Sequence, residues 1–170
     1  AVSVRDYLTT NFEVPVYCKI DVLEYNKRKD GQVLGNRDFY NNPADYESDF
    51  MRFATVTDYF IAGHFFGDGS PFLFTKEDAK KDHFKIRLVA DISCDIDGPI
   101  ASTLRASTIT DPIYGYDLQT ATEVDFKNPG AITVMAVDNL PCELPKDASE
   151  GFGDLFLEHV IPAFYNDDKE

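Results

Sequence analysis

The sequence has few basic residues and few cysteines, and both shortages exclude classes of protein. Its 170 residues contain 16 Lys and Arg against 30 Asp and Glu, so the net charge is −14 at pH 7. Such a charge repels phosphate backbones, and we expect no nucleic acid partner. The three cysteines are odd in number and lack CxxC or Cys/His spacing, and the three histidines are scattered. These features predict free thiols, a cytoplasmic location, no disulfide framework and no metal site.

Long apolar runs and nucleotide-binding glycine motifs are also missing. The longest purely apolar run covers only a few residues near 134–137, far below the roughly 20 needed to span a bilayer. We therefore expect no membrane partner, and no signal peptide is visible. Neither GxGxxG nor GxxxxGK[ST] occurs, and the stretch from Gly63 to Gly69 is too bulky to cradle a pyrophosphate.

What the chain does contain is the pattern of an α/β protein. Apolar residues make up 44% of the sequence, enough for a packed core. Caps and periodicity predict helices over 3–11, 49–56, 76–82 and 145–164, and strands over 16–21, 59–62, 86–92 and 132–137. Residues 25–49 read as an irregular insertion with short helical pieces. The last two strands are almost continuously apolar, which favours a mainly parallel sheet covered on both faces.

The most unusual block is the acidic segment that follows the strand over 86–92. Asp91, Asp95 and Asp97 lie where that strand ends and a Gly-Pro break begins. Ligands bind outside the carboxyl ends of parallel strands, and crowded carboxylates raise one another's pKa, which suits acid–base chemistry. An acidic calcium-like turn or a helix N-cap cluster explains the same spacing equally well.

Three further positions are candidates with a structural alternative. Asn139 follows the strand over 132–137 and could bind a ligand amide or sugar, or simply cap a turn. Arg105 could hold an anion, or form a surface salt bridge with one of the many acids. His64 could lie over a ligand at a strand end, although a histidine satisfied by the backbone is the more common case.

Taken together, these blocks resemble the alanine dehydrogenase/transhydrogenase-like family, in its saccharopine dehydrogenase and lysine–ketoglutarate reductase branch. The resemblance covers about residues 57–164 and rests on Asp91–Asp95 with Gly98, Ser107–Ile109 with Asp111 and Pro112, Tyr114–Asp117, and Asp138–Pro141 with Leu144 and Pro145. It implies hydride transfer between NAD or NADP and an amino or imino acid. It also implies part of a Rossmann-like, doubly wound sheet with flanking helices and a long C-terminal helix.

The resemblance also assigns roles to single residues. Asp95 matches an aspartate beside the nicotinamide and the substrate, and is the catalytic candidate. The implied cofactor contacts are Ile92, Ser93, Cys94, Asp95, Arg105, Val137, Asp138, Asn139 and Leu140. The family's double glycine after this motif is Asp97-Gly98 here.

The family's N-terminal substrate-binding residues and glycine-rich turn are not found, so the resemblance implies the C-terminal portion of a larger enzyme. Residues 1–56 would be a helical and irregular part of the nucleotide-binding domain, 57–141 its later strands, and 142–170 a returning helix. Half a doubly wound sheet leaves an edge and an apolar face uncovered, which predicts a homodimer. A standalone, non-catalytic α/β binding module is the alternative, and a calcium-binding domain is a weaker one.

Overall fold

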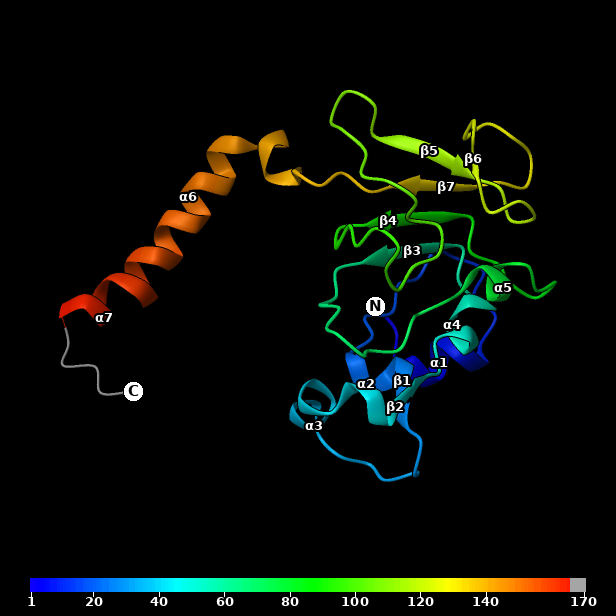
Figure 1. Ribbon diagram of the computed structural model, residues 1–170, viewed down its shortest axis with the longest axis horizontal. Helices are drawn as coiled ribbons and strands as arrows, with labels where there is room; N and C mark the ends of the chain where they lie inside the picture. Colours follow the sequence, from blue (N-terminus) through cyan, green and yellow to red (C-terminus); the bar gives the residue numbers. More distant parts are fainter. Residues whose placement is uncertain (166–170) are drawn as a thin grey trace. The chain divides into compact units, whose positions relative to one another are not determined.

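Five short strands form the main sheet of the computed structural model, which describes residues 1–165 (Figure 1). In spatial order they are β3 (Tyr59–Ala62), β4 (Leu88–Asp91), β7 (Ile132–Met135), β5 (Ile113–Tyr116) and β6 (Glu123–Val124). The first three run parallel, whereas β5 pairs antiparallel with both β7 and β6. The α/β class is therefore confirmed, but the sheet is mixed and the prediction of a mainly parallel sheet is wrong.

The connection between β5 and β7 explains this difference. A parallel neighbour needs a crossover of a dozen or more residues, usually a helix. Residues 117–131 instead contain β6 and a series of turns closed by local hydrogen bonds, such as the one from the Thr120 amide to the Asp117 carboxylate at 2.8 Å. Without a helix to carry the chain across a sheet face, β7 returns beside β5 in the opposite direction.

One face of the sheet carries most of the core. Along β4 and β7, buried residues such as Val89 and Val134 alternate with partly exposed ones. The buried side chains join a cluster that includes Phe50, Phe53 and Phe74 from the flanking segments. The side chains on the other face of these strands are only half-buried, so full cover of the kind expected on both faces is found on one face.

Short helices precede and interrupt the sheet: α1 (Val4–Thr9), α2 (Val22–Tyr25), α3 (Asn36–Asn41), α4 (Met51–Ala54) and α5 (Lys76–Ala79). The predicted caps are confirmed, since Ser3 accepts from the Asp6 amide and Thr75 forms a capping box with Asp78. The predicted strand over 16–21 is absent. That stretch alternates half-buried and exposed residues, but its backbone is not paired with any described strand.

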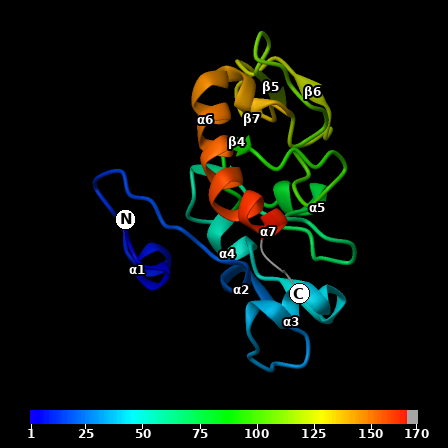
Figure 2. The same ribbon diagram turned by 90° about the vertical axis from the view of Figure 1, so that its left-hand side faces the viewer.

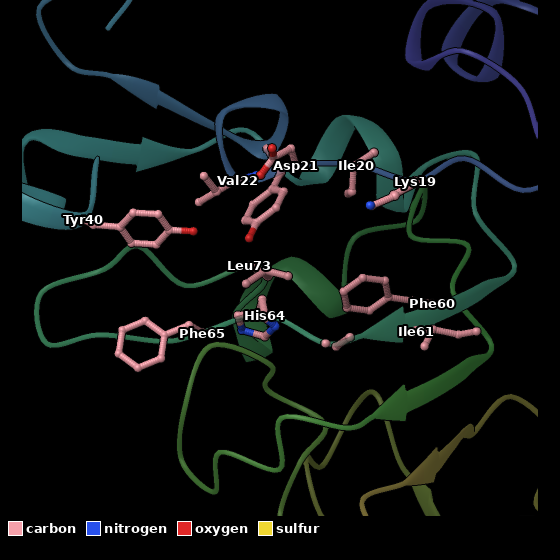
Figure 3. A pocket seen from close by; sticks show the side chains of 13 residues that line it. Lys19, Ile20, Asp21, Val22, Tyr40, Phe60, Ile61, His64, Phe65 and Leu73 are labelled. Carbon is pink, nitrogen blue, oxygen red and sulfur yellow. The ribbon is translucent and has the colours of Figure 1, made fainter. Parts of the chain in front are cut away.

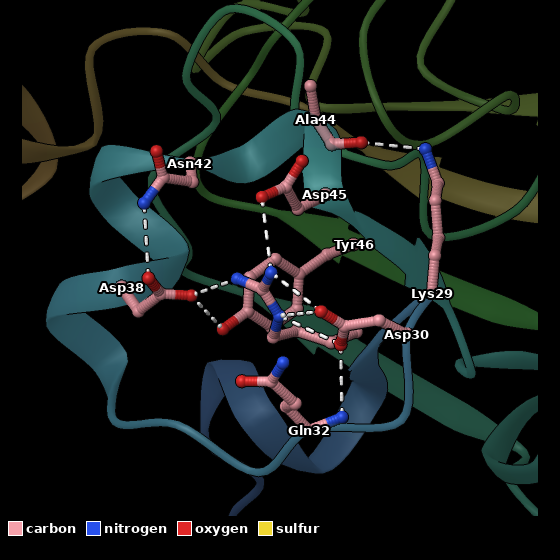
Figure 4. Close-up of polar contacts among 9 residues, drawn as sticks. Lys29, Asp30, Gln32, Asp38, Asn42, Ala44, Asp45 and Tyr46 are labelled. Carbon is pink, nitrogen blue, oxygen red and sulfur yellow. Dashed lines mark hydrogen bonds and ion pairs between the residues drawn. The ribbon is translucent and has the colours of Figure 1, made fainter.

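The insertion between α2 and α4 is organised around Arg28. β1 (Asn26–Arg28) pairs antiparallel with β2 (Tyr46–Ser48), and the turn η1 (Pro43–Asp45) precedes β2. Arg28 bonds to Asp38 at 2.6 Å, to Asp30 at 2.9 Å and to Asp45 at 3.3 Å (Figure 4). This network closes the segment beside the buried rings of Phe39 and Tyr46.

Residue contacts divide the chain into two units, Ala1–Asp138 and Asn139–Glu170. The second unit begins with the turn η2 (Leu140–Glu143) and continues as α6 (Pro145–Leu155), the π-helical turn η3 (Phe156–Val160) and α7 (Ile161–Tyr165) (Figure 2). The predicted helix over 145–164 is confirmed, although no side chain caps its start. Residues 166–170, at the end of the predicted third segment, lie outside the described residues.

Among the described residues, no helix is both long and apolar enough to cross a bilayer.

Candidate functional site

The candidate site lies where the three parallel strands end. Because β3, β4 and β7 run in the same direction, the segments after Ala62, Asp91 and Met135 leave the sheet at one edge. The amide of Ile92 still continues the ladder, donating to the carbonyl of Ala62 at 2.8 Å. Ligands of α/β sheets bind at this kind of edge.

Asp91 shapes the turn at this edge from inside the protein. Its side chain is 1% exposed. The carboxylate accepts hydrogen bonds from the Thr103 hydroxyl at 2.7 Å and from the Cys94 amide at 3.1 Å. A buried carboxylate needs such donors. Asp91 is thus committed to the fold, which leaves Asp95 and the exposed Asp97 as the acidic groups that the turn presents.

The turn after Asp91 has an unusual backbone. Cys94 and Asp97 have φ of 52° and 55°, a left-handed conformation that costs a non-glycine residue about 1–2 kcal/mol. A Cβ at Gly98 would lie 2.6 Å from the carbonyl oxygen of Asp95. Asp97 thus adopts a conformation suited to glycine, at a position where the sequence resemblance implies glycine. Strain of this kind concentrates at ligand sites.

Cys94 joins this turn to the end of β7. Its thiol donates to the carbonyl of Ala136, with Sγ and O 3.2 Å apart. Burial, followed by the nearby carboxylates of Asp91, Asp138 and Asp95, raises the pKa of this thiol. The thiol form therefore prevails at neutral pH, and Cys94 is a positioning group rather than a nucleophile.

Ser93 joins the same turn to the end of β3. Its hydroxyl donates to the carbonyl of His64 at 2.8 Å and accepts from the His64 amide at 3.0 Å. These bonds lock the two strand ends together. The imidazole Nδ1 lies 3.3 Å from the same hydroxyl, whereas Nε2 is buried and has no hydrogen-bond partner within residues 1–165. The backbone of His64 is thus satisfied, but its ring is not.

Ser107 is a residue of this edge that the sequence reasoning did not single out as a site. Its amide donates to Ala136 at 2.8 Å, its hydroxyl accepts from the Ala136 amide at 3.1 Å, and it bridges in parallel to Val137. Ser107 is completely buried and Val137 is 4% exposed. Both residues therefore support the strand ends from within the protein core. Only the pairing of Ser107 with Ala136, 29 residues away, reveals this role.

Arg105 lies beside β5 and β6. Its guanidinium forms two hydrogen bonds with Glu123, at 2.8 and 2.9 Å, and lies 4.7 Å from the centre of the Tyr114 ring. The bonds to Glu123 raise the pKa of Arg105 further above its ordinary value. Of the two sequence interpretations of Arg105, an anion site or a surface salt bridge, the structure therefore contains the salt bridge.

The remaining predicted cofactor contacts differ in how exposed they are and in which of the two units they belong to. Ile92 is 50% exposed, Asp95 is partly exposed and Asp138 is exposed. The carboxylates of Asp95 and Asp138 make no hydrogen bond or ion pair with any described residue. Asn139 and Leu140 belong to the second unit. Within residues 1–165, no three His, Cys, Asp or Glu side chains are grouped to hold a metal ion.

By its fold, the chain contains an α/β domain with a mixed sheet and a polar edge at the ends of its parallel strands. No family model matches it. It is similar to alpha-aminoadipic semialdehyde synthase from Arabidopsis thaliana, with 29% identity over 148 residues, and to the mitochondrial alpha-aminoadipic semialdehyde synthase of Mus musculus, with 28% identity over 159 residues. These matches cover 84% and 82% of this chain.

The relatives are homologues from the lysine–ketoglutarate reductase and saccharopine dehydrogenase branch, so the resemblance read from the sequence is confirmed. The chain spans only 14% of the plant relative and 17% of the mouse relative.

Proposed function

We propose that this chain is the C-terminal portion of an NAD(P)-dependent amino-acid dehydrogenase of the saccharopine dehydrogenase type. The parent enzyme would transfer hydride between the nicotinamide and an amino or imino acid, and this chain alone would be inactive. The observation that carries the proposal is the meeting of the Asp95 turn with the ends of β3 and β7. The small share of the relatives that the chain spans also supports it.

The chemistry of the edge fits the nicotinamide end of NAD or NADP. An oxidised nicotinamide is cationic, and it would be stabilised by unpaired carboxylates such as the half-buried Asp95 and the exposed Asp138. The exposed side chain of Ile92 offers an apolar surface for a flat ring. The same carboxylates would repel a pyrophosphate, and Arg105 is already paired with Glu123. The phosphates would therefore lie against other parts of the parent enzyme.

When bound, the cofactor supplies the hydride acceptor or donor. The residues of this chain would orient it and manage protons. The turn locked by Ser93 and Cys94 holds the Asp95 carboxylate at the edge, where it would position the reacting amine or imine and stabilise its positive charge. Asp91 is not available for that role, because its carboxylate already accepts hydrogen bonds from Thr103 and the Cys94 amide.

Asp95→Asn in the full-length parent enzyme tests this assignment. We expect turnover to fall at least tenfold, about 1.4 kcal/mol in the activation barrier, because an amide cannot stabilise a charge as a carboxylate does. Steady-state kinetics with saturating cofactor measure the change. Asp97→Asn, an exposed residue of the same turn, is the matched control and should retain turnover. Unchanged turnover in Asp95→Asn would remove Asp95 from the catalytic assignment.

The size of the native protein separates the enzyme from the standalone α/β binding module. An antibody against this chain should detect a band well above 19.2 kDa in the source cells. A band at 19.2 kDa would favour the module. Fractionation of the same cells would decide between the cytoplasm predicted from the cysteines and the mitochondrial location in the name of the mouse relative.

We also propose that the isolated chain forms a homodimer through the free edge of β3. Tyr59 and Ile61 are 72% and 68% exposed on this edge strand, and unpaired strand edges with apolar side chains associate. Size exclusion with light scattering should report a dimer, and Ile61→Lys should be monomeric. Val33→Lys, at a side chain 96% exposed, is the control. A monomeric wild-type chain would contradict the proposal.

A further inference from the structure

The ring of His64 is held inside the protein at the end of β3 (Figure 3). Nε2 has less than 1 Å² of accessible surface and no hydrogen-bond partner within residues 1–165. Nδ1 lies 3.3 Å from the hydroxyl oxygen of Ser93, which also accepts from the His64 amide at 3.0 Å and donates to the His64 carbonyl at 2.8 Å. These three interactions, the His64–Ser93 contact, join the end of β3 to the turn that presents Asp95.

The Ser93 hydroxyl decides which ring nitrogen carries the proton of the neutral imidazole. Its single hydrogen goes to the His64 carbonyl, so the oxygen can only accept from Nδ1. Nδ1 therefore carries the ring proton, and Nε2 keeps a lone pair. In this state the ring donates one hydrogen bond and buries one uncharged acceptor.

A second proton on the ring would have to bind Nε2. It would create a charged N–H group inside the protein with no acceptor, and an unpaired buried charge is far more costly than an unpaired lone pair. The carboxylates of Asp91 and Asp95 favour the cation, but burial outweighs them and lowers the pKa of His64 below its ordinary 6.5. The carboxylate of Asp91 already accepts from Thr103 and the Cys94 amide.

The other polar groups around the ring do not change this balance. Lys19 and Asp21, from the segment before α2, are exposed and carry opposite charges. Tyr25 of α2 and Tyr40 of α3 line the same cavity of about 320 Å³, and phenols contribute no charge near neutral pH. The state of the ring is therefore set by its burial and by the two carboxylates of the turn.

Acid therefore favours a different position of the ring. A histidine in water takes up its second proton near pH 6.5, whereas the buried ring of His64 takes it up only at lower pH. As the pH falls below about 6.5, a ring exposed to water becomes progressively more stable relative to the buried ring. Once the ring leaves, the His64–Ser93 contact loses the hydrogen bond from Nδ1 and the packing of the imidazole.

We propose that His64 is a positioning residue for Asp95. Its neutral ring holds the turn after β4 against the end of β3, and uptake of a second proton expels the ring and loosens the turn. This inference rests on the proposed function only where it concerns catalysis. The pH-sensitive contact itself is measured without cofactor or turnover, so the two proposals fail separately.

Amide hydrogen exchange in the 170-residue chain tests the contact. Between about pH 7 and pH 5, we expect the protection factor of the His64 amide to fall at least about tenfold after correction for the intrinsic pH dependence of exchange. The Ser107 amide donates to the backbone carbonyl of Ala136 at the same edge, and should keep its protection. Unchanged protection at His64, or an equal loss at Ser107, would overturn the proposal.

Two variants link the effect to the charge on His64. His64→Asn has an N–H group for Ser93 but cannot become charged, so the protection of the amide at position 64 should be the same at both pH values. His83→Asn, at an exposed histidine, should respond to pH as the wild type does. If His64→Asn does not fold, ¹⁵N spectra of the wild-type imidazole decide. A ring of His64 that becomes charged at or above pH 6.5 would contradict the buried neutral state.

The pH profile of the full-length parent enzyme tests the positioning role. Relative to its value at about pH 7.5, kcat/KM at about pH 5.5 should be at least about threefold higher in His64→Asn than in the wild type, because the turn no longer loosens in acid. His83→Asn should keep the wild-type profile. Identical profiles for His64→Asn and wild type would overturn the positioning role of His64.

Discussion

Two polar clusters in the first unit use similar residues in opposite ways. Around Arg28, three carboxylates surround one guanidinium whose side chain is only 12% exposed (Figure 4). The hydrogen bond from Arg28 lowers the pKa of Asp30 to about 2, and the hydroxyl of Tyr46, followed by Arg28, lowers the pKa of Asp38. At the strand ends, by contrast, Asp95 and Asp138 have no partner among the described residues.

The difference separates polar groups that hold the fold from polar groups that remain available. In the Arg28 cluster all three carboxylates are paired with the one guanidinium, which leaves a negative net charge but little free hydrogen-bonding capacity for a ligand. At the strand ends, the hydroxyls of Ser93 and Ser107, the thiol of Cys94 and the buried carboxylate of Asp91 hold the backbone in place through hydrogen bonds. The remaining carboxylates lie at the surface of a strained turn. A polar cluster with unpaired members on a rigid support is the better candidate for function.

Asp91→Ala should break the edge with the largest effect on stability. It leaves the Cys94 amide and the Thr103 hydroxyl buried without an acceptor, at about 1–3 kcal/mol for each group and roughly 3 kcal/mol in total. Urea unfolding followed by circular dichroism measures the loss. Asp82→Ala, at an exposed carboxylate, should change stability by less than about 0.5 kcal/mol. Equal losses in the two variants would mean that Asp91 does not support the turn.

Gly98→Ala should deform the same turn with a smaller effect. The new Cβ would lie 2.6 Å from the carbonyl oxygen of Asp95 and 2.7 Å from its Cβ. Relieving these contacts requires a backbone shift, which we expect to cost about 2 kcal/mol. Gly63→Ala adds a Cβ with nothing within 4 Å and serves as the control. A Gly98→Ala variant as stable as Gly63→Ala would show that the turn adapts freely.

Arg28→Met should test the other half of the comparison, in which the carboxylates are paired and support the fold. The pKa of Asp30 in the folded protein is about 2, below its ordinary 3.8. Its contribution to stability is therefore present above about pH 4 and lost as the pH falls toward 2. Arg28→Met should be less stable at pH 7 and lose less stability between about pH 4 and pH 2. Urea unfolding across this range compares it with the wild type, with Arg5→Met as the control. Parallel pH profiles for wild type and Arg28→Met would contradict this account.

Local signals in the sequence predicted several elements well. The strand over 59–62 and the helix starts at Ser3 and Thr75 depend on apolar runs and caps within a few residues. β5 was not predicted because Gly115 interrupts a short run, and its strand character comes from pairing with β7. The predicted strand over 16–21 had a suitable pattern but found no partner.

The candidate site divides in the same way. The acidic block after β4 was visible in the sequence because a hydrophobic strand runs directly into it. The sequence did not show which polar groups of this block support the fold, because the hydrogen bonds of Asp91 with Thr103 and of Ser93 with His64 join residues 12 and 29 positions apart. Arg105 had two sequence interpretations, and only the position of Glu123 on β6 shows which partner it has in this structure.

The sequence by itself determined the α/β class, the acidic strand end and the resemblance to the saccharopine dehydrogenase branch, because composition, periodicity and short motifs are local properties. The tertiary structure decided that the strands of the sheet run in mixed directions and that one face of the sheet is more deeply buried. It also decided that Nε2 of His64 has no hydrogen-bond partner among the described residues. These depend on which segments pair across the fold, and pairing follows from the burial and hydrogen bonding of residues far apart in the chain.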